Sequence, residues 1–214
     1  GAGSPVIYST GNITANNVNG VANNSEIGVV EGKNSITLTN SNVTGYKDNG
    51  FMLYQSFSGD AESGIARLKA ENNTLTTHST GAFIYVNNTT AEADLTGNTI
   101  LMPNTTTLVK AAADSRWGKD GENGGHLTLR ASNQELSGNI IADSISTIAI
   151  DMANRSSLVG AINTDNTAKE VTLKLSKDST WTLTGDSYVK SLTNEDTTNS
   201  NIHLNGYKLV VADK

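Results

Sequence analysis

The feature that most constrains this chain is a period-two alternation of apolar and polar residues that recurs along its length. Each occurrence predicts a strand, a polar turn and a second short strand. Because successive side chains of a strand point to opposite faces, each strand is expected to bury one face and expose the other. The chain is therefore predicted to be all-β. The five segments are 35–45, 65–75, 91–101, 126–138 and 170–185.

The alternating segments resemble one another, which predicts a repeated unit. The apolar residue after each Asn-rich turn recurs at intervals of 32, 25 and 36 residues, in the series Val43, Leu75, Ile100 and Leu136. A second apolar series runs between them, and its segments 50–54 (GFMLY) and 81–85 (GAFIY) are close copies. We expect its central residues to stack as well, namely Val29, Met52, Phe83, Leu108 and Ile148. A strand-rich unit repeated in this way is typical of a β-solenoid.

Loops explain the spread of the intervals. A solenoid coil of three short strands needs about 20–25 residues, and extra length leaves the stack at a corner. The expected loops are 56–63, 87–94 and 114–126. A β-sandwich or jelly roll also needs short strands, but neither predicts two interleaved series of similar segments. We therefore expect a single solenoid domain over residues 1–214.

The composition fits such a unit, because 26 Asn and 27 Thr make up 53 of the 214 residues. Thr favours strands, since its branched side chain packs on a pleated sheet. Asn tolerates left-handed turns and hydrogen-bonds to neighbouring backbone. In stacked coils we expect inward apolar residues to fill the core and Asn side chains to form ladders from coil to coil.

Charge and composition exclude several classes of partner. The net charge is −6 and there is no run of Lys or Arg, so no nucleic-acid partner is expected. The chain has no Cys and its three His residues are scattered, so neither a metal site nor a cofactor is expected. No apolar run approaches the roughly 18 residues that a membrane-spanning helix requires.

A more specific pattern lies in residues 179–192, STWTLTGDSYVKSL. It fits the order Trp-x-Leu/Val-Thr-Gly-x-Ser-x-Val-x-x-Leu at Trp181, Leu183, Thr184, Gly185, Ser187, Val189 and Leu192. A later apolar strand follows at Tyr207, Leu209, Val210 and Val211. In these stretches the chain resembles bacterial autotransporter passengers of the pertactin and diffuse-adherence adhesin type; elsewhere it agrees only in its Asn-, Thr- and Gly-rich, Cys-free style. We expect Gly185 to make the turn and four residues to face the core, namely Trp181, Leu183, Val189 and Leu192.

The resemblance implies a right-handed parallel β-helix of the pectate-lyase and pertactin kind. It also implies a surface-exposed adhesion or virulence module, held outside the bacterial cell after export through the outer membrane. Membrane attachment in this family comes from a C-terminal barrel. We therefore expect the chain to be a fragment of a longer passenger, with residues 178–214 as the final coils before a folding-assisting segment and the barrel.

The resemblance also sets the expected partners. These are host-cell surface glycans or proteins, or copies of the same protein on other cells. A long, polar, acidic face suits weak multivalent contacts of this kind. A passive stalk that lifts an N-terminal functional head away from the cell is an alternative without any binding role.

An enzyme is the main alternative, because parallel β-helices include polysaccharide lyases and glycoside hydrolases. A glycosidase needs an acid and a base carboxylate across the bond to be broken. Residues 163–165 (NTD) match one element of such a motif, but the accompanying Asp-Asp, Gly-His-Gly and Arg-x-Lys elements are absent. Residues 185–187 (GDS) begin a serine-protease-like pattern that Tyr188 interrupts. We therefore expect no catalysis, unless the fold brings three or more carboxylates together beside an Arg or Lys.

The best candidate for a binding site is the Gly-rich loop 114–126, DSRWGKDGENGGH. Its Trp117 either stacks on a sugar ring or folds back to cover the edge of a coil, and the sequence leaves both alternatives open. The candidate binding residues are Arg116, Trp117, Lys119, Asp120, Glu122 and His126.

Overall fold

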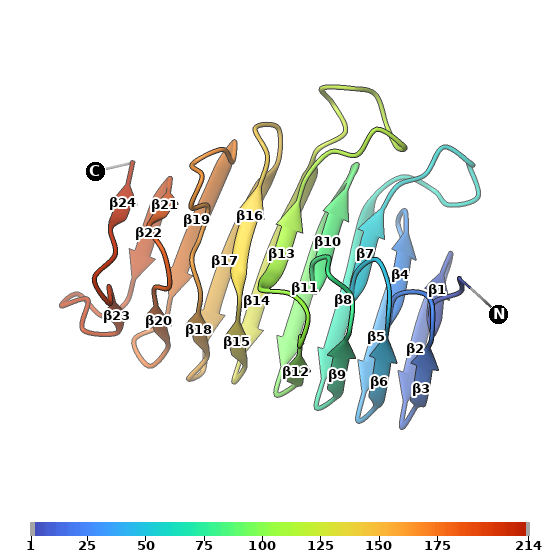
Figure 1. Ribbon diagram of the computed structural model, residues 1–214, viewed down its shortest axis with the longest axis horizontal. Coiled ribbons are helices and arrows are strands. Elements are labelled where there is room, and N and C mark those ends of the chain that lie inside the picture. The colour runs from blue at the N-terminus through green and yellow to red at the C-terminus, as the bar shows by residue number, and fades with distance from the viewer. Residues whose placement is uncertain (1–2, 213–214) are drawn as a thin grey trace.

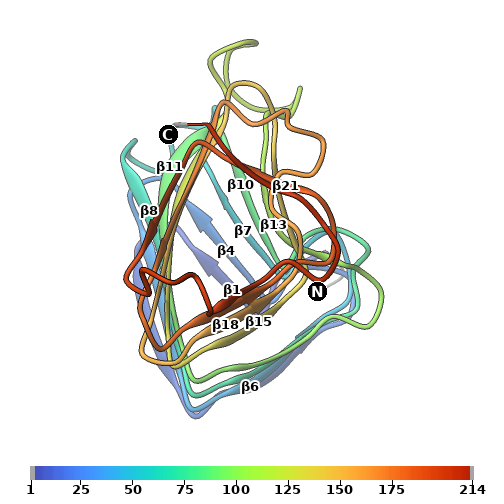
Figure 2. The ribbon, with the colours of Figure 1, turned by 90° about the vertical axis from the view of Figure 1, so that its left-hand side faces the viewer.

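The computed structural model describes residues 3–212, and these residues form 24 strands and no helix. The prediction of an all-β chain is therefore confirmed for these residues, and the strands pair in parallel (Figure 1). The chain passes repeatedly through three sides in the same order, and each passage pairs with the one before it. Between residues 159 and 170 the first side is marked only by a single bridge, from Ile162 to Ile140. We call one such passage a circuit and the three sides the first, second and third walls. Figure 2 shows them around a common interior.

The strands are distributed over the walls as follows. The first wall holds β1 (Ile7–Ser9), β4 (Gly28–Glu31), β7 (Phe51–Tyr54), β10 (Ile84–Asn87), β13 (Thr107–Ala111) and β16 (Asn139–Ala142), followed by the two-stranded sheet of β21 (Ser187–Val189) and β24 (Leu209–Val211). The second wall holds β2 (Asn12–Asn16), β5 (Ser35–Thr39), β8 (Ile65–Glu71), β11 (Thr89–Thr96), β14 (Gly125–Ser132), β17 (Thr147–Ala153), β19 (Glu170–Leu175) and β22 (Ser191–Asn194). The third wall is divided into two sheets, one of β3 (Asn19–Ala22), β6 (Asn42–Gly45), β9 (Thr74–Thr77) and β12 (Thr99–Leu101), the other of β15 (Glu135–Ser137), β18 (Ser157–Val159), β20 (Thr180–Thr182) and β23 (Ile202–His203).

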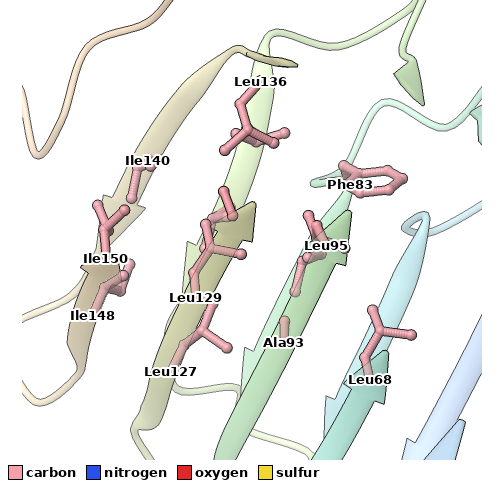
Figure 3. Packing of buried hydrophobic residues seen from close by; sticks show 14 of the residues in the cluster. Leu68, Phe83, Ala93, Leu95, Leu127, Leu129, Leu136, Ile140, Ile148 and Ile150 are labelled. Atoms are coloured by element: carbon pink, nitrogen blue, oxygen red, sulfur yellow. The ribbon is translucent and has the colours of Figure 1, made fainter. Parts of the chain in front are cut away.

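The second wall carries the most regular part of the core. Its inward residues stack in register, and Figure 3 shows this packing around Leu68, Ala93, Leu129 and Ile150. A neighbouring stack of inward side chains in the same wall alternates large and small residues from strand to strand. Its members, in register, are Leu38, Ala70, Leu95, Ala131 and Met152. This alternation lets successive strands interlock without voids. Their outward neighbours are polar, which is the alternation that the sequence displays.

A left-handed residue turns the chain from the second wall into the third in six circuits. These residues have φ between 48° and 62°, and five of the six are Asn: Asn17, Asn40, Asn72, Gly97, Asn133 and Asn154. After four of these corners the next residue points inward and accepts a hydrogen bond from the preceding circuit. Ser41, Asn73, Asn98 and Gln134 form this ladder at 2.9–3.1 Å. The predicted Asn ladder is therefore present, with Ser and Gln taking part in it.

The two predicted apolar series are confirmed only in part. Val43, Leu75 and Ile100 stack in register, but Leu136 lies in the other sheet of the third wall. In the first wall Val29 pairs with Met52, whereas the next residues in register are Tyr85 and Lys110. The expected Phe83 and Leu108 thus lie two residues early, and Ile148 belongs to the second wall. The first-wall strands β4, β7 and β10 are buried on both faces, so they offer no alternation that would set the register.

Two of the three predicted loops are confirmed. Residues 55–64 connect β7 to β8, and residues 112–124 connect β13 to β14. The loop expected at 87–94 is wrong, because Asn87 ends β10 and residues 89–96 form β11. The inward residues Ala91, Ala93 and Leu95 are fully or almost fully buried, so small side chains here mark a strand that packs closely on its neighbours.

The Trp-containing pattern is part of the core. Trp181, Leu183 and Val189 are buried, while Leu192 is half-buried near the last circuits. The indole Nε1–H of Trp181 donates to the carbonyl of Gly160 at 2.9 Å. Ser187 is fully buried and bonds to the backbone of Ile162 and Gly185, so its hydroxyl has a structural role and is inaccessible to a substrate.

Candidate binding site

The loop of residues 112–124 projects beyond the strands, and its charged side chains pair with one another. The guanidinium of Arg116 binds the carboxylate of Asp114 through two nitrogens, at 2.9 and 3.0 Å. Lys119 and Glu122 form a second, exposed ion pair three residues apart. Asp120 lies exposed at the tip. Asn123 anchors the loop from inside, because its amide donates to the carbonyls of Asp114 and Trp117.

Trp117 folds back onto the molecule. Its ring lies 5.3 Å from the ring of Tyr54 and 6.1 Å from that of Phe57, which belongs to the other large loop. The indole is half-buried and joins two loops that are about sixty residues apart in the sequence. Of the two alternatives left open by the sequence, the described conformation is the one in which Trp117 covers the strands.

His126 is separated from the other predicted binding residues, because it belongs to the second wall. It lies on β14, where its Nδ1 is 3.0 Å from the hydroxyl of Thr147. Burial and the nearby charge of Lys169 lower the pKa of His126. The loop and this imidazole therefore do not form one site.

A hollow on the outer face of the first wall lies beside this loop and was not predicted. Its volume is about 380 Å³, and Met52 and Tyr85 are among the residues that line it. Both belong to a second apolar cluster outside the main core, with Val29, Tyr54, Ala82 and Ala112. The sequence signal for this cluster is the continuous apolar run in GFMLY, which indicates a strand buried on both faces.

Charged residues from several circuits surround the hollow. They are Glu26, Asp48, Lys110, Asp114 and Arg116. The ammonium group of Lys110 lies 5.4 Å from the centre of the Tyr85 ring, within the range of a cation–π contact. These residues are brought together by the stacking of circuits, since they span ninety positions of the sequence.

Burial and ion pairing set the protonation states of two groups that line the hollow, Tyr85 and Asp114. Burial, assisted by the charge of Asp114, raises the pKa of Tyr85 to about 12, so its phenol stays protonated at neutral pH. The hydrogen bond from Arg116 holds the pKa of Asp114 below its usual range. Asp114 is thus ionised at neutral pH and cannot act as a proton donor.

Three carboxylates, those of Glu26, Asp48 and Asp114, line this hollow together with Lys110 and Arg116. These are the residue types that the catalytic alternative requires, namely three carboxylates beside an Arg or Lys. Within residues 3–212 no three His, Asp or Glu side chains are arranged to hold a metal ion, and acid–base cleavage of a glycosidic bond does not require one. Asp114 is ionised and held in an ion pair by Arg116, so it cannot supply the acid of a catalytic pair.

A buried carboxylate lies in the first wall near the Trp117 contact. Glu31 is 3% exposed and accepts hydrogen bonds from the hydroxyls of Tyr8, Tyr54, Ser56 and Ser58. These bonds hold Tyr54 in place under Trp117, so the carboxylate supports the aromatic cluster from below. The sequence contains no pattern that would have predicted this cluster.

The described part of the chain has no helix that is long and apolar enough to span a membrane. Comparison with known proteins shows no relative: no family model matches the chain, and neither a curated protein nor a solved structure matches it.

Proposed function

We propose that this chain is a segment of a bacterial autotransporter passenger, folded as a right-handed parallel β-helix of the pectate-lyase and pertactin kind. Its parallel walls, the stacking of one circuit on the next and the Trp181 pattern support this assignment. In this proposal the segment is exposed on the cell surface and acts in adhesion without catalysis.

The binding site in this proposal is the hollow on the first wall, and its ligand is a host-cell glycan. The observation that carries it is the combination of an aromatic floor at Tyr85 with both donors and acceptors at the rim. Lys110 and Arg116 supply donors, while Asp48 and Glu26 supply acceptors. A sugar ring presents one apolar face and many hydroxyl groups, so such a mixed surface suits it better than it suits an apolar ligand.

The test is glycan binding by the purified chain and by matched variants. We expect Lys110→Ala to weaken binding at least tenfold on a glycan array and in calorimetry. Lys119→Ala serves as the control, because Lys119 is a lysine of the adjoining loop that pairs with Glu122 and does not line the hollow. Equal binding by the two variants, or no glycan binding by the parent chain, contradicts the proposal.

A second function, polysaccharide cleavage, is favoured by the three carboxylates beside Lys110 and Arg116. It predicts that the chain releases new reducing ends from a polysaccharide, and that Asp48→Asn abolishes the release. Binding without release under the same conditions leaves the adhesin as the better account.

The passive-stalk alternative is tested on cells. Bacteria that display residues 1–214 without any additional head should adhere to host cells or to one another if the segment is an adhesin. Cells that remain dispersed and unattached support the stalk.

A further inference from the structure

The third wall contains a step between β12 and β15, and its cause is the length of chain in two neighbouring circuits. The circuits are stacked at two places, where Asn98 bonds to Gln134 and where Thr107 pairs with Asn139. The chain takes nine residues to pass from Asn98 to Thr107 but only five from Gln134 to Asn139. The longer path must therefore bulge outward. Figure 2 shows β15 and β18 closer to the middle of the molecule than β6.

The shorter circuit turns its corner at a single residue, Gly138, whose φ is +126°. The equivalent corners before the step use residues 46–50, 78–83 and 102–106. Gly160 of the next circuit lies directly beside this corner, and a Cβ added to it would lie 1.9 Å from the carbonyl oxygen of Gly138. The change in path is thus built into the sequence by two glycines.

The step leaves one edge of β12 without a neighbouring strand. Among residues 3–212, β12 has a single ladder partner, β9. The N–H of Thr99 donates to the carbonyl of Asn73 on the β9 side at 2.8 Å. Because main-chain groups of successive residues in a strand point to opposite sides, the N–H and C=O of Ile100 point toward the step.

The burial of the side chains also shows that a stack of inward residues ends at β12. Val43 and Leu75, the residues before Ile100 in the same stack, are fully buried, whereas Ile100 is half-buried. Two adjoining hollows of about 540 and 560 Å³ run along the step and share Ile100, Leu101 and Ser137. Val159 forms part of the surface and is 45% exposed.

We propose that the step is a docking site for one extended segment of a partner polypeptide, which adds to the β3–β6–β9–β12 sheet as its next strand. The existing ladder defines the chemistry of the occupant. Its aligned strands read Asn42–Val43–Thr44, Thr74–Leu75–Thr76 and Thr99–Ile100–Leu101. The segment is therefore expected to place an aliphatic residue over Ile100, with polar neighbours as in β6 and β9. Arg155 and Glu135 line the same hollow with opposite charges, which favours an uncharged segment. Main-chain bonding of this type is β-augmentation.

The site binds a short segment. β12 has three residues, and Pro103, which has no N–H, follows soon after. A single segment therefore binds weakly, and repeated copies on a surface would be needed for firm attachment.

The probe is an uncharged synthetic peptide of residues 72–77 (NNTLTT), capped at both ends, which carries the β9 sequence and is titrated into the isotopically labelled chain and followed by NMR. We expect saturable shifts of the backbone amides of residues 99–101 and 135–137. The same peptide N-methylated at the Thr that follows its central Leu keeps its side chains but loses the main-chain donor that would reach the carbonyl of Ile100, so it should bind roughly fivefold more weakly.

Two matched variants locate the site. Val159→Glu places a charge on the exposed surface of the step and should abolish the shifts, whereas Val21→Glu, at an exposed Val far along the same wall, should leave them unchanged. Equal melting temperatures confirm that both variants fold. The proposal is overturned by an absence of shifts at millimolar peptide, by equal binding of the N-methylated peptide, or by shifts confined to the first and last circuits.

Discussion

Asn98 accepts two hydrogen bonds from Asn73 in the preceding circuit, one from the backbone N–H at 3.1 Å and one from the side-chain amide at 2.8 Å. It also donates to the carbonyl of Ala70 at 2.8 Å. Both Asn residues are more than nine-tenths buried. The polar ladder at this corner therefore satisfies main-chain groups that no water can reach, and it holds the circuits in register.

Asn98→Ala should destabilise the chain by about 3 kcal/mol, because it leaves several buried donors and acceptors without partners. Urea unfolding measures the change. Asn104→Ala is the matched control, since Asn104 is exposed and makes one bond to the carbonyl of His78, and its effect should stay within about 0.5 kcal/mol. Equal effects of the two variants would show that the ladder adds nothing to stability.

Substitution of Trp181, near the C-terminal circuits, should lower the free energy of unfolding by a larger amount. Its side chain is fully buried, so Trp181→Ala should cost about 3–5 kcal/mol through the cavity it leaves. Trp181→Phe keeps most of the apolar contact but removes the bond to Gly160, and should cost about 1–3 kcal/mol. Thermal melts should rank the two variants in this order, and a Phe variant as unstable as the Ala variant is inconsistent with a packing role.

Trp117→Ala should loosen the loop of residues 112–124 more than it destabilises the whole chain. It removes contacts with Tyr54 and Phe57, and aromatic pairs of this kind contribute about 1 kcal/mol. Trypsin cleavage after Arg116 or Lys119 should then become several-fold faster. Tyr207→Ala removes an exposed aromatic residue elsewhere and should leave this cleavage rate unchanged.

Much of the second wall could be predicted from the sequence, because its strands alternate strictly. Segments such as 91–101 and 126–138 contain the observed strand, turn and second strand. The first wall could not be aligned in this way. Its strands β7 and β10 are buried on both faces, so shifting Phe83 onto Met52 preserves the pattern while moving the register by two residues.

The site was less predictable than the fold, for a related reason. The exposed loop and Trp117 are visible in the sequence as a Gly-rich interruption. The partners around the hollow are not, because Glu26, Asp48 and Lys110 meet only when the four circuits from β4 to β13 are stacked in the correct register. The step at β12 likewise depends on comparing the lengths of two circuits between matched points, which requires the pairing to be known.

The lowered pKa of the Glu31 carboxyl group should make the stability of the chain depend on pH. Burial alone would raise the pKa of this carboxyl group, but hydrogen bonds from Ser56, Tyr8, Ser58 and Tyr54 outweigh it and lower the pKa below its ordinary value of 4.5. The unfolded chain therefore takes up a proton at a higher pH than the folded chain. The stabilisation from the ionised carboxylate is fully present above the unfolded pKa and is lost as the pH falls through the folded pKa.

Glu31→Gln should accordingly lower the free energy of unfolding by about 2 kcal/mol at pH 7, and the difference from the parent chain should shrink as the pH is lowered from about 6 to about 3. Urea unfolding at each pH measures it. Glu62→Gln is the control, because Glu62 is 79% exposed in its pair with Lys33 and should change stability by no more than about 0.5 kcal/mol at neutral pH. A Glu31→Gln difference that stays constant or grows on acidification contradicts the assignment of an ionised, hydroxyl-bound carboxylate.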